Sequence, residues 1–213
     1  MGPLFQDHML VAPVLQAEIA RRCQIGDFPD EPNSIANDLG LIDLPDGQHV
    51  RVWLCHAADS VLLDDLGQTI LITRLHNPGR GKRALPGGLL DATPGGVEAS
   101  RQAALREAIE ETGISAEVLA KAEVMQLGHR RHVRPFDIRQ AWNDLPGTPV
   151  RKNELFTVST LAFRVRLSGD LRYMALRAGD DATAIDIVPA EQVSLSELAV
   201  PDHLDMIRDA LDV

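Results

Sequence analysis

The chain has 213 residues, of which 45% are hydrophobic and 24% are charged, a balance typical of a globular protein with one large domain. Thirty-one acidic and 21 basic side chains give a net charge of −10, which argues against a surface that coats nucleic acid, because phosphate backbones need a basic footprint. The two cysteines, Cys23 and Cys55, have no metal-ligand spacing around them and suggest neither a disulfide framework nor a zinc site, so we expect a cytoplasmic protein.

The first part of the chain predicts a helix followed by an arm. Asp7 to Gln24 has the spacing of an amphipathic helix, and its apolar part is too short to cross a bilayer. Asp27 to Gly47 contains three prolines and several acidic residues, which is the composition of a loop. We therefore divide the chain into an N-terminal helix and arm, residues 1–45, and a main domain, residues 46–213.

The main domain predicts strands that are interrupted by one helix and followed by a second helix. Apolar residues at helical spacing predict helices over Ala99 to Thr112, which Gly113 ends, and over Asp202 to Leu211. Runs of β-branched and apolar residues predict strands over Val50 to Leu63, Gln68 to Arg74, Val124 to Arg131, Phe156 to Leu167, Leu171 to Leu176 and Ile185 to Val188. This order favours an α+β fold, an α/β/α sandwich with a mixed sheet between helices, over a doubly wound fold.

Three carboxylates on the first of these helices form the densest cluster of reactive groups. Glu107 precedes Glu110 and Glu111 by three and four residues, so the three side chains project within one sector of the helix. Crowding of like charges gives a solvated helix little stability, whereas a divalent cation would neutralise it, and Mg²⁺ and Mn²⁺ prefer carboxylate oxygens. Immediately upstream, Leu85-Pro86-Gly87-Gly88 is a strand exit whose glycines let the backbone approach a ligand.

This loop and helix resemble the Nudix box, the signature of Mg²⁺-dependent hydrolases that cleave nucleoside diphosphates linked to another group. The resemblance is carried by Gly88, Glu98 and the run REAIEETGI from Arg106 to Ile114. In one departure, nine residues rather than the usual five separate Gly88 from Glu98, as if Ala92 to Gly96 contained four extra residues. For Glu98, a role near the metal and a favourable charge at the helix N-terminus both stay open. The resemblance implies a Nudix fold with a metal-binding helix. The alternative is that the acidic residues form an ordinary helix exposed to solvent.

The resemblance also implies roles for individual residues of the loop and helix. Glu107, Glu110 and Glu111 would hold Mg²⁺, for which Mn²⁺ could substitute, and the carbonyl of Gly88 would be a further ligand. Arg106 would orient these carboxylates. Such ions neutralise the charge of a diphosphate and lower the pKa of bound water.

Three further segments resemble the mitochondrial-type ADP-ribose pyrophosphatases and the related domain of an ADP-ribose-gated cation channel. They are His56-Ala57-Ala58-Asp59, Ala178-Gly179-Asp180-Asp181-Ala182 and, in a shortened form, Phe136 to Trp142. The resemblance implies that ADP-ribose is cleaved to AMP and ribose 5-phosphate. Another nucleoside diphosphate derivative as substrate, such as a sugar nucleotide or a dinucleotide, and a module that senses ADP-ribose without turnover both stay open.

These segments supply the remaining candidate site residues. Asp180 or Asp181 would act as the base that accepts a proton from the attacking water, and the residues expected to bind substrate are His56, Asp59, Arg139, Trp142 and Asp180. Each has an ordinary structural alternative, namely a strand end, an acidic turn, a surface ion pair or a cover for the core. The expected partner is a small nucleotide substrate, with no nucleic acid and no membrane, and the sequence leaves a homodimer open.

Overall fold

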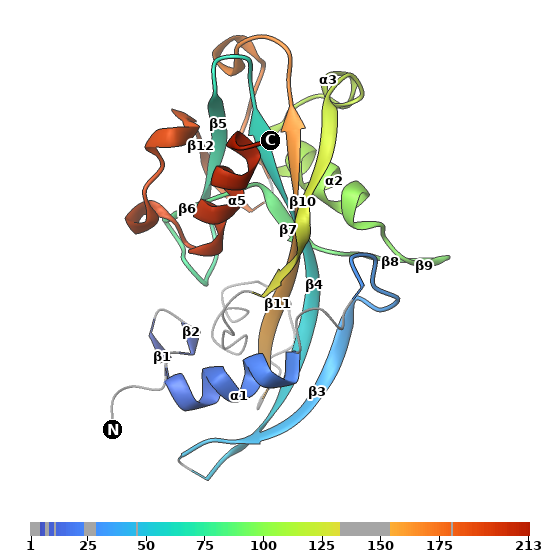
Figure 1. Ribbon diagram of the computed structural model, residues 1–213, viewed down its shortest axis with the longest axis vertical. Helices are drawn as coiled ribbons and strands as arrows, with labels where there is room; N and C mark the ends of the chain where they lie inside the picture. Colours follow the sequence, from blue (N-terminus) through green and yellow to red (C-terminus); the bar gives the residue numbers. More distant parts are fainter. Residues whose placement is uncertain are drawn as a thin grey trace.

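The structure is a computed structural model in which helices cover both faces of one mixed sheet (Figure 1). It describes residues 12–23, 29–45, 47–132, 154–179 and 181–213, together with the backbone of two short paired strands, β1 (Phe5–Gln6) and β2 (Met9–Leu10). Helix α2 (Ser100–Thr112) packs on one face of the sheet and helix α5 (Asp202–Leu211) on the other. This arrangement confirms the α+β class and the mixed sheet between helices.

The sheet is centred on one long strand, β4. Its strands are β3 (Ala36–Asp43), β4 (His49–Leu63), β5 (Gln68–Arg74), β6 (Arg83–Ala84), β7 (Gly87–Leu89), β10 (Glu123–His132), β11 (Glu154–Arg166) and β12 (Ala182–Pro189). The order is β10-β11-β4-β5-β12, with β3 and β7 also paired to β4 and β6 to β5. The β11–β4 pair is parallel, and the other pairs between these strands are antiparallel. Smaller elements are the hairpin of β8 (Ala92–Thr93) and β9 (Gly96–Val97), helix α3 (Ala116–Leu119) and the 3₁₀ turns η2 (Leu171–Tyr173), η3 (Ala190–Gln192) and η4 (Leu195–Glu197).

Side chains of β4 alternate between the two faces, because successive residues of a strand point to opposite sides. Ala58 packs in one buried cluster with Ala104 of α2, whereas Val61 packs in another with Ile207 of α5. The two helices therefore bury opposite sides of the same strand. Any segment that pairs with β4 in the sheet therefore lies between α2 and α5.

The sheet opens between β4 and β5. These strands pair at Leu63 and Thr69, but farther along β4 the partner is β7, with Gly87 opposite Asp59 and Gly88 opposite Ala58. On the other side of the opening, strand β6 pairs with β5. The glycine segment thus enters the sheet through this opening and lies between α2 and α5.

The N-terminal part of the chain contains more regular structure than its composition predicts. Helix α1 (Pro13–Cys23) begins at Pro13 rather than at Asp7, in line with the preference of proline for the first helical position. Strand β3 lies within the segment predicted to be a loop and pairs with β4. Both elements share a core with the first half of β4 and the start of β11, formed by Leu15, Ile19, Cys23, Ile42, Leu44, Val50, Val52, Leu54 and Leu155. The boundary between residues 1–45 and 46–213 stays a prediction.

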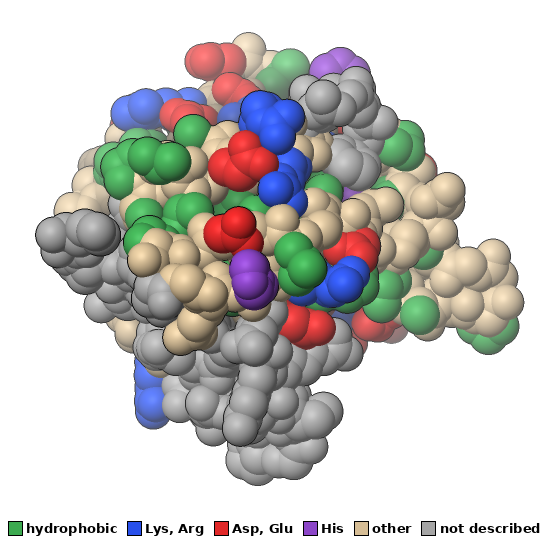
Figure 2. All heavy atoms as spheres, turned by 90° about the horizontal axis from the view of Figure 1, so that it is seen from below, with side chains coloured by type: hydrophobic (Ala, Val, Ile, Leu, Met, Phe, Trp, Pro, Cys, Tyr) green, Lys and Arg blue, Asp and Glu red, His purple; other side chains and the backbone are tan. Residues whose placement is uncertain are grey.

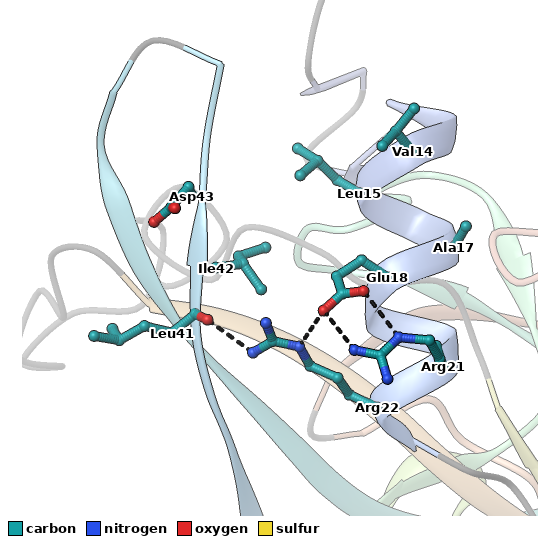
Figure 3. Close-up of a pocket in the computed structure, with 9 residues that line it drawn as sticks. All are labelled: Val14, Leu15, Ala17, Glu18, Arg21, Arg22, Leu41, Ile42 and Asp43. Atoms are coloured by element: carbon teal, nitrogen blue, oxygen red, sulfur yellow. Dashed lines mark hydrogen bonds and ion pairs between the residues drawn. The ribbon is translucent and has the colours of Figure 1, made fainter.

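A groove of about 490 Å³ lies between α1 and β3 (Figure 3). Arg22 crosses it and donates from Nη1 to the carbonyl oxygens of Leu39, at 3.0 Å, and Leu41, at 2.7 Å. Its Nε donates to the carboxylate of Glu18 at 2.7 Å. Because open strand edges invite pairing with other chains, these bonds to β3 carbonyls protect the edge. The groove therefore reflects how α1 packs, and it lies apart from the carboxylates of α2.

Figure 2 views the molecule from below, the end that α1 and β3 form in Figure 1. Acidic, basic and hydrophobic side chains are interspersed on this end, and Val14 and Leu41 are exposed apolar residues at the groove. Within the described ranges, no helix combines the length and the apolar character needed to cross a membrane.

The strand predicted over Leu171 to Leu176 is wrong. The segment forms the turn η2 followed by irregular chain. The Asp64 carboxylate accepts the backbone N–H of Leu171 at 3.0 Å, and Asp170 accepts that of Arg172 at 2.9 Å. Side-chain acceptors of this kind favour a turn over a strand, because they satisfy the backbone donors locally.

Candidate active site

The glycine segment lies directly against the carboxylates of α2. The backbone N–H of Gly87 donates to Oε2 of Glu111 at 2.9 Å. A Cβ atom on Gly88 would lie 2.2 Å from Oε1 of Glu107, and one on Gly87 would lie 2.1 Å from Oδ1 of Asp59. A side chain at Gly87 would also meet the backbone of Ala58, so this position requires glycine, whereas one at Gly88 would displace the Glu107 carboxylate.

Arg106 holds the acidic groups of this region together. Its guanidinium donates to Glu98 from Nε at 3.0 Å and from Nη2 at 2.9 Å. From Nη1 it donates to Glu107 at 2.7 Å and to Glu110 at 2.9 Å. These carboxylates, Glu98 above all, raise the pKa of Arg106 further above its usual range. The structure thus places Arg106 where it orients two of the three candidate ligands.

The extra residues before Glu98 form a protruding hairpin. Strands β8 and β9 pair with each other, and their residues are exposed except for half-buried Val97. At the base of the hairpin, the N–H of Glu98 donates to the carbonyl of Asp91 at 2.9 Å. The insertion therefore returns the chain to its starting point, and Glu98 can pair with Arg106 despite the longer spacing.

Glu111 has a strongly perturbed pKa. Its side chain is buried, and burial raises its pKa to about 8, assisted by the nearby charges of Glu107 and Asp59 and opposed by the hydrogen bond from Gly87 and by Arg74. Glu107 is also buried, whereas Glu110 is more exposed. The buried carboxyl groups face the glycine segment, so they are concentrated where that segment enters the sheet.

The donor atoms of this cluster suit a hard divalent cation. The candidate ligands, namely the carboxylates of Glu107, Glu110 and Glu111 and the carbonyl of Gly88, offer oxygen alone, as Mg²⁺ and Mn²⁺ prefer. Within the described part of the chain, no three His, Cys, Asp or Glu side chains converge as a metal site. Arg106 holds one oxygen each of Glu107 and Glu110 and is also bound to Glu98, which is not one of the candidate ligands. The residues present therefore fit Mg²⁺.

Asp59 lies beneath the glycine segment with two partners that the sequence did not reveal. Its Oδ2 accepts the hydroxyl of Thr160 at 2.6 Å, and its Oδ1 is 3.8 Å from Nε2 of His203 on α5. Burial raises the pKa of Asp59 to about 6, and burial lowers that of His203 to about 3. The signal that could have revealed His203 is its spacing from Met206 and Ile207, which predicts that it points inward on an amphipathic helix.

His56 lies inside the protein. Its side chain is fully buried, and its Nε2 is 2.6 Å from Oδ1 of Asn37 on β3. Burial lowers the pKa of His56 to about 4. The predicted contact of His56 with substrate stays a prediction.

The acidic loop after η2 packs against the end of α2. The N–H of Gly179 donates to the carbonyl of Glu111 at 3.3 Å, and the N–H of Arg177 donates to that of Thr112 at 2.8 Å. Asp181 is largely exposed, and its carboxylate is 3.5 Å from Nε2 of His76. This loop therefore lies against the end of the helix that carries the carboxylates. The other three residues proposed for this part of the site, Asp180, Arg139 and Trp142, lie outside the described residues.

Two arginines outside the carboxylate cluster, Arg83 and Arg130, have structural partners. Arg83 pairs with Asp186 at 3.0 Å. Arg130 is buried and donates to the carbonyls of Asp30, Ala57 and Ser159 at 2.9 to 3.0 Å. Both guanidinium groups therefore connect parts of the fold.

A match to a family model agrees with this geometry. The model of the NUDIX domain matches residues 54–210, which span most of β4, the glycine segment, α2 and nearly all of α5. The chain belongs to the Nudix hydrolase family. Helix α1 and strand β3 precede the matched Nudix domain, so the core that they share with β4 is an addition at its N-terminal side.

Solved structures similar to this Nudix protein include several of low sequence identity. A bifunctional NMN adenylyltransferase/ADP-ribose pyrophosphatase from Francisella tularensis, complexed with AMP and a Mn ion, is 24% identical with a TM-score of 0.44, covering 74% of this chain and 41% of that chain. This chain thus spans about two fifths of the Francisella enzyme's length. The NUDIX domain of Shewanella oneidensis NrtR, complexed with ADP-ribose, is 22% identical with a TM-score of 0.49, covering 74% of this chain and 86% of that chain.

A MutT protein from Methanosarcina mazei Go1 is 18% identical with a TM-score of 0.49, covering 75% of this chain and 94% of that chain. A search of curated proteins found no match to this chain. The family assignment therefore rests on the family model and on the glycine segment and α2 themselves.

Proposed function

We propose that this Nudix hydrolase cleaves the diphosphate of ADP-ribose to AMP and ribose 5-phosphate with Mg²⁺, for which Mn²⁺ can substitute. The observation that carries the proposal is the contact between the glycine segment and α2, where Gly87 donates to Glu111 and Gly88 adjoins Glu107. This contact gathers carboxylate and carbonyl oxygens at one buried surface. A diphosphate, which is itself anionic, could approach that surface once a cation had neutralised it.

In this proposal, Glu107, Glu110, Glu111 and the carbonyl of Gly88 hold the cation. When bound, Mg²⁺ would neutralise the diphosphate charge and lower the pKa of a bound water. Arg106 keeps the carboxylates in place through its bonds to Glu98, Glu107 and Glu110. The short fixed distances matter because orientation supplies a large part of the catalysis of such displacements.

The choice of ADP-ribose rests on the outer segments of the sequence. His56 to Asp59 and Ala178 to Ala182 resemble the mitochondrial-type ADP-ribose pyrophosphatases, and the Nudix box alone does not require either segment. Arg139 and Trp142 are proposed to contact the diphosphate and the adenine. We further propose that the protein acts in the cytoplasm on a small nucleotide, without a nucleic-acid or membrane partner.

The proposed base is a carboxylate of the loop after η2. Its support is the packing of Gly179 against the last turn of α2, which brings Asp181 to the same end of the helix as Glu111. A carboxylate of ordinary pKa needs only a suitable position to accept a proton from an acidified water. Asp181→Asn should lower kcat by about a hundredfold with little change in KM. A mainly raised KM would instead assign the loop to substrate binding.

A substrate panel with product identification tests the proposal. Purified protein with Mg²⁺ is offered ADP-ribose, sugar nucleotides, dinucleotides including NAD⁺, and nucleoside triphosphates, and the products are separated by chromatography. We expect the highest kcat/KM for ADP-ribose, with AMP released. A higher value for another diphosphate derivative would contradict the substrate, and calorimetric binding of ADP-ribose without AMP release would contradict turnover.

A further inference from the structure

His203 on α5 is joined to the glycine segment by a buried hydrogen bond. The backbone N–H of Leu85 donates to its Nδ1 at 3.0 Å, and the side chain is 5% exposed. Because Nδ1 is the acceptor, the proton of the neutral ring is on Nε2. The Nε2 atom is 3.8 Å from Oδ1 of Asp59. The ring is therefore fixed in one tautomer and one orientation.

The segment from Leu85 to Gly88 is held at successive residues from different sides. Leu85 is bound to α5 through His203, the carbonyl of Pro86 accepts the N–H of Ser60 on β4 at 2.8 Å, and Gly87 donates to Glu111 of α2. Below Gly87, the carboxylate of Asp59 fills the space that a side chain would occupy. Only two residues lie between the His203 contact and Gly88.

We propose that His203 is a positioning residue, which fixes the glycine segment so that Gly87 and Gly88 meet the carboxylates of α2. The C-terminal helix thereby completes the metal-binding surface from the far side of the sheet. This inference rests on the proposed function, in that Gly88 and the glutamates are taken as metal ligands. Residues that orient metal ligands typically change metal affinity or activity by 10- to 100-fold when replaced.

Two substitutions at this position separate the hydrogen bond from the packing of α5. His203→Asn keeps an acceptor oxygen near the position of Nδ1, whereas His203→Leu keeps volume and removes the acceptor. Met206→Ala is the matched control for packing alone, because Met206 is fully buried on the same helix, in the same apolar cluster as Leu85, and its side chain is apolar. It should lower stability through a cavity without disturbing the Leu85 bond.

The experiment measures Mn²⁺ affinity by electron paramagnetic resonance, kcat and KM, and hydrogen–deuterium exchange of the Leu85–Leu90 peptide. His203→Leu should weaken Mn²⁺ binding about tenfold, lower kcat about tenfold with little change in KM, and speed exchange of that peptide. His203→Asn should return affinity and kcat to within about threefold of wild type, and Met206→Ala should leave both unchanged.

Unchanged exchange and Mn²⁺ affinity in a folded His203→Leu protein would overturn the inference, as would equal losses in Met206→Ala. Failure of His203→Asn to rescue the leucine variant's defects would also contradict it. If the wild type bound no Mn²⁺, the proposed function would fail. If His203→Leu then changed only the exchange of the peptide, His203 would support the fold alone, and its role at the metal would be overturned.

Discussion

At the first residue of α2, the backbone N–H of Ser100 donates to the Glu31 carboxylate at 2.9 Å, and the Ser100 hydroxyl donates to the carbonyl of Asp30 at 3.0 Å. Arg130 binds the same hydroxyl and the same carbonyl. At the other end of the helix, two of the crowded carboxylates, Glu107 and Glu111, are buried. Burial raises the pKa of Glu111 to about 8. The first end is therefore capped by partners from other elements, whereas the second end crowds carboxyl groups together, which Gly87 and Arg106 hold in place.

This difference teaches which end of α2 serves stability and which serves chemistry. The N-cap residue of α2 is Ala99, which has no side-chain acceptor, whereas Ser, Thr, Asp or Asn is usual at this position. Glu31 supplies the missing acceptor from a part of the chain outside the matched domain. The C-terminal half holds like charges together at a cost in stability, as expected for groups that a cation neutralises. Substitutions at the two ends should therefore separate the two properties.

Loss of a carboxylate at the crowded C-terminal end of α2 should have the largest effect. Glu111→Gln and Glu110→Gln should each lower kcat by at least about a hundredfold while the protein stays folded, since each removes a proposed metal ligand. Steady-state kinetics and circular dichroism measure this. Chelation should abolish wild-type activity, and Mg²⁺ or Mn²⁺ should restore it. Full turnover by either variant, or restoration by Zn²⁺ alone, would contradict the oxygen-ligand site.

Disruption of the N-terminal end of α2 should instead lower the stability of the protein. Arg130→Leu leaves the carbonyls of Asp30, Ala57 and Ser159 without their buried donor, which should reduce the free energy of unfolding by about 3 kcal/mol. The kcat of the folded fraction should change less than about threefold, in contrast with the glutamate variants. Urea denaturation and kinetics on the same samples test this, and a hundredfold loss of kcat with native stability would reverse the comparison.

The two neighbouring glycines offer a finer test. A Cβ on Gly87 would lie 2.7 Å from the backbone oxygen of Ala58, whereas a Cβ on Gly88 would meet the flexible side chain of Glu107. Gly87→Ala should therefore lower the free energy of unfolding by about 1–3 kcal/mol, and Gly88→Ala should lower it less but displace a proposed ligand and reduce kcat about tenfold. Thermal unfolding and kinetics of the pair decide this. Equal stability losses would show that Glu107 cannot move.

The smallest expected effect concerns the acceptor for Ser100. Glu31→Ala should lower the free energy of unfolding by about 1 kcal/mol, as the loss of a helix cap does. Glu31→Gln should keep most of the wild-type stability, because its amide oxygen still accepts the N–H of Ser100. Urea titration of both variants and wild type measures the difference. Equal losses in the two variants would mean that the charge of Glu31, acting on Arg130 or on the helix dipole, matters more than its hydrogen bond.

The parts that the sequence predicts well depend on residues near one another in the chain. Helix α2 and its end at Gly113, which has a left-handed φ of 68°, follow from local spacing. The approach of the glycine segment to α2 follows from the Nudix resemblance. The contact of His203 with Leu85 joins residues far apart in the chain, and no short pattern specifies it.

The incorrect predictions have the same origin. The segment Leu171 to Leu176 has the apolar content of a strand, but carboxylates at Asp64 and Asp170 satisfy its first N–H groups. Strand β3 is flanked by prolines that indicate a loop, yet β4 offers it a partner strand. In both cases a distant or neighbouring partner decided the structure, and propensity did not.

The most direct test of the account measures the free energy of unfolding against pH, with and without Mg²⁺, for wild type and Glu111→Gln. Because the folded-state pKa of Glu111 is raised to about 8, its contribution to stability is full below its unfolded value of 4.5 and is lost as pH rises through about 8. Without Mg²⁺, Glu111→Gln should therefore gain stability relative to wild type as pH rises across this window. Mg²⁺ should stabilise wild type and leave the variant nearly unchanged, because a ligand stabilises the state that binds it. Equal stabilisation of both proteins by Mg²⁺, or a variant that loses stability relative to wild type as pH rises, would contradict the claim that this end of α2 is built to hold a cation.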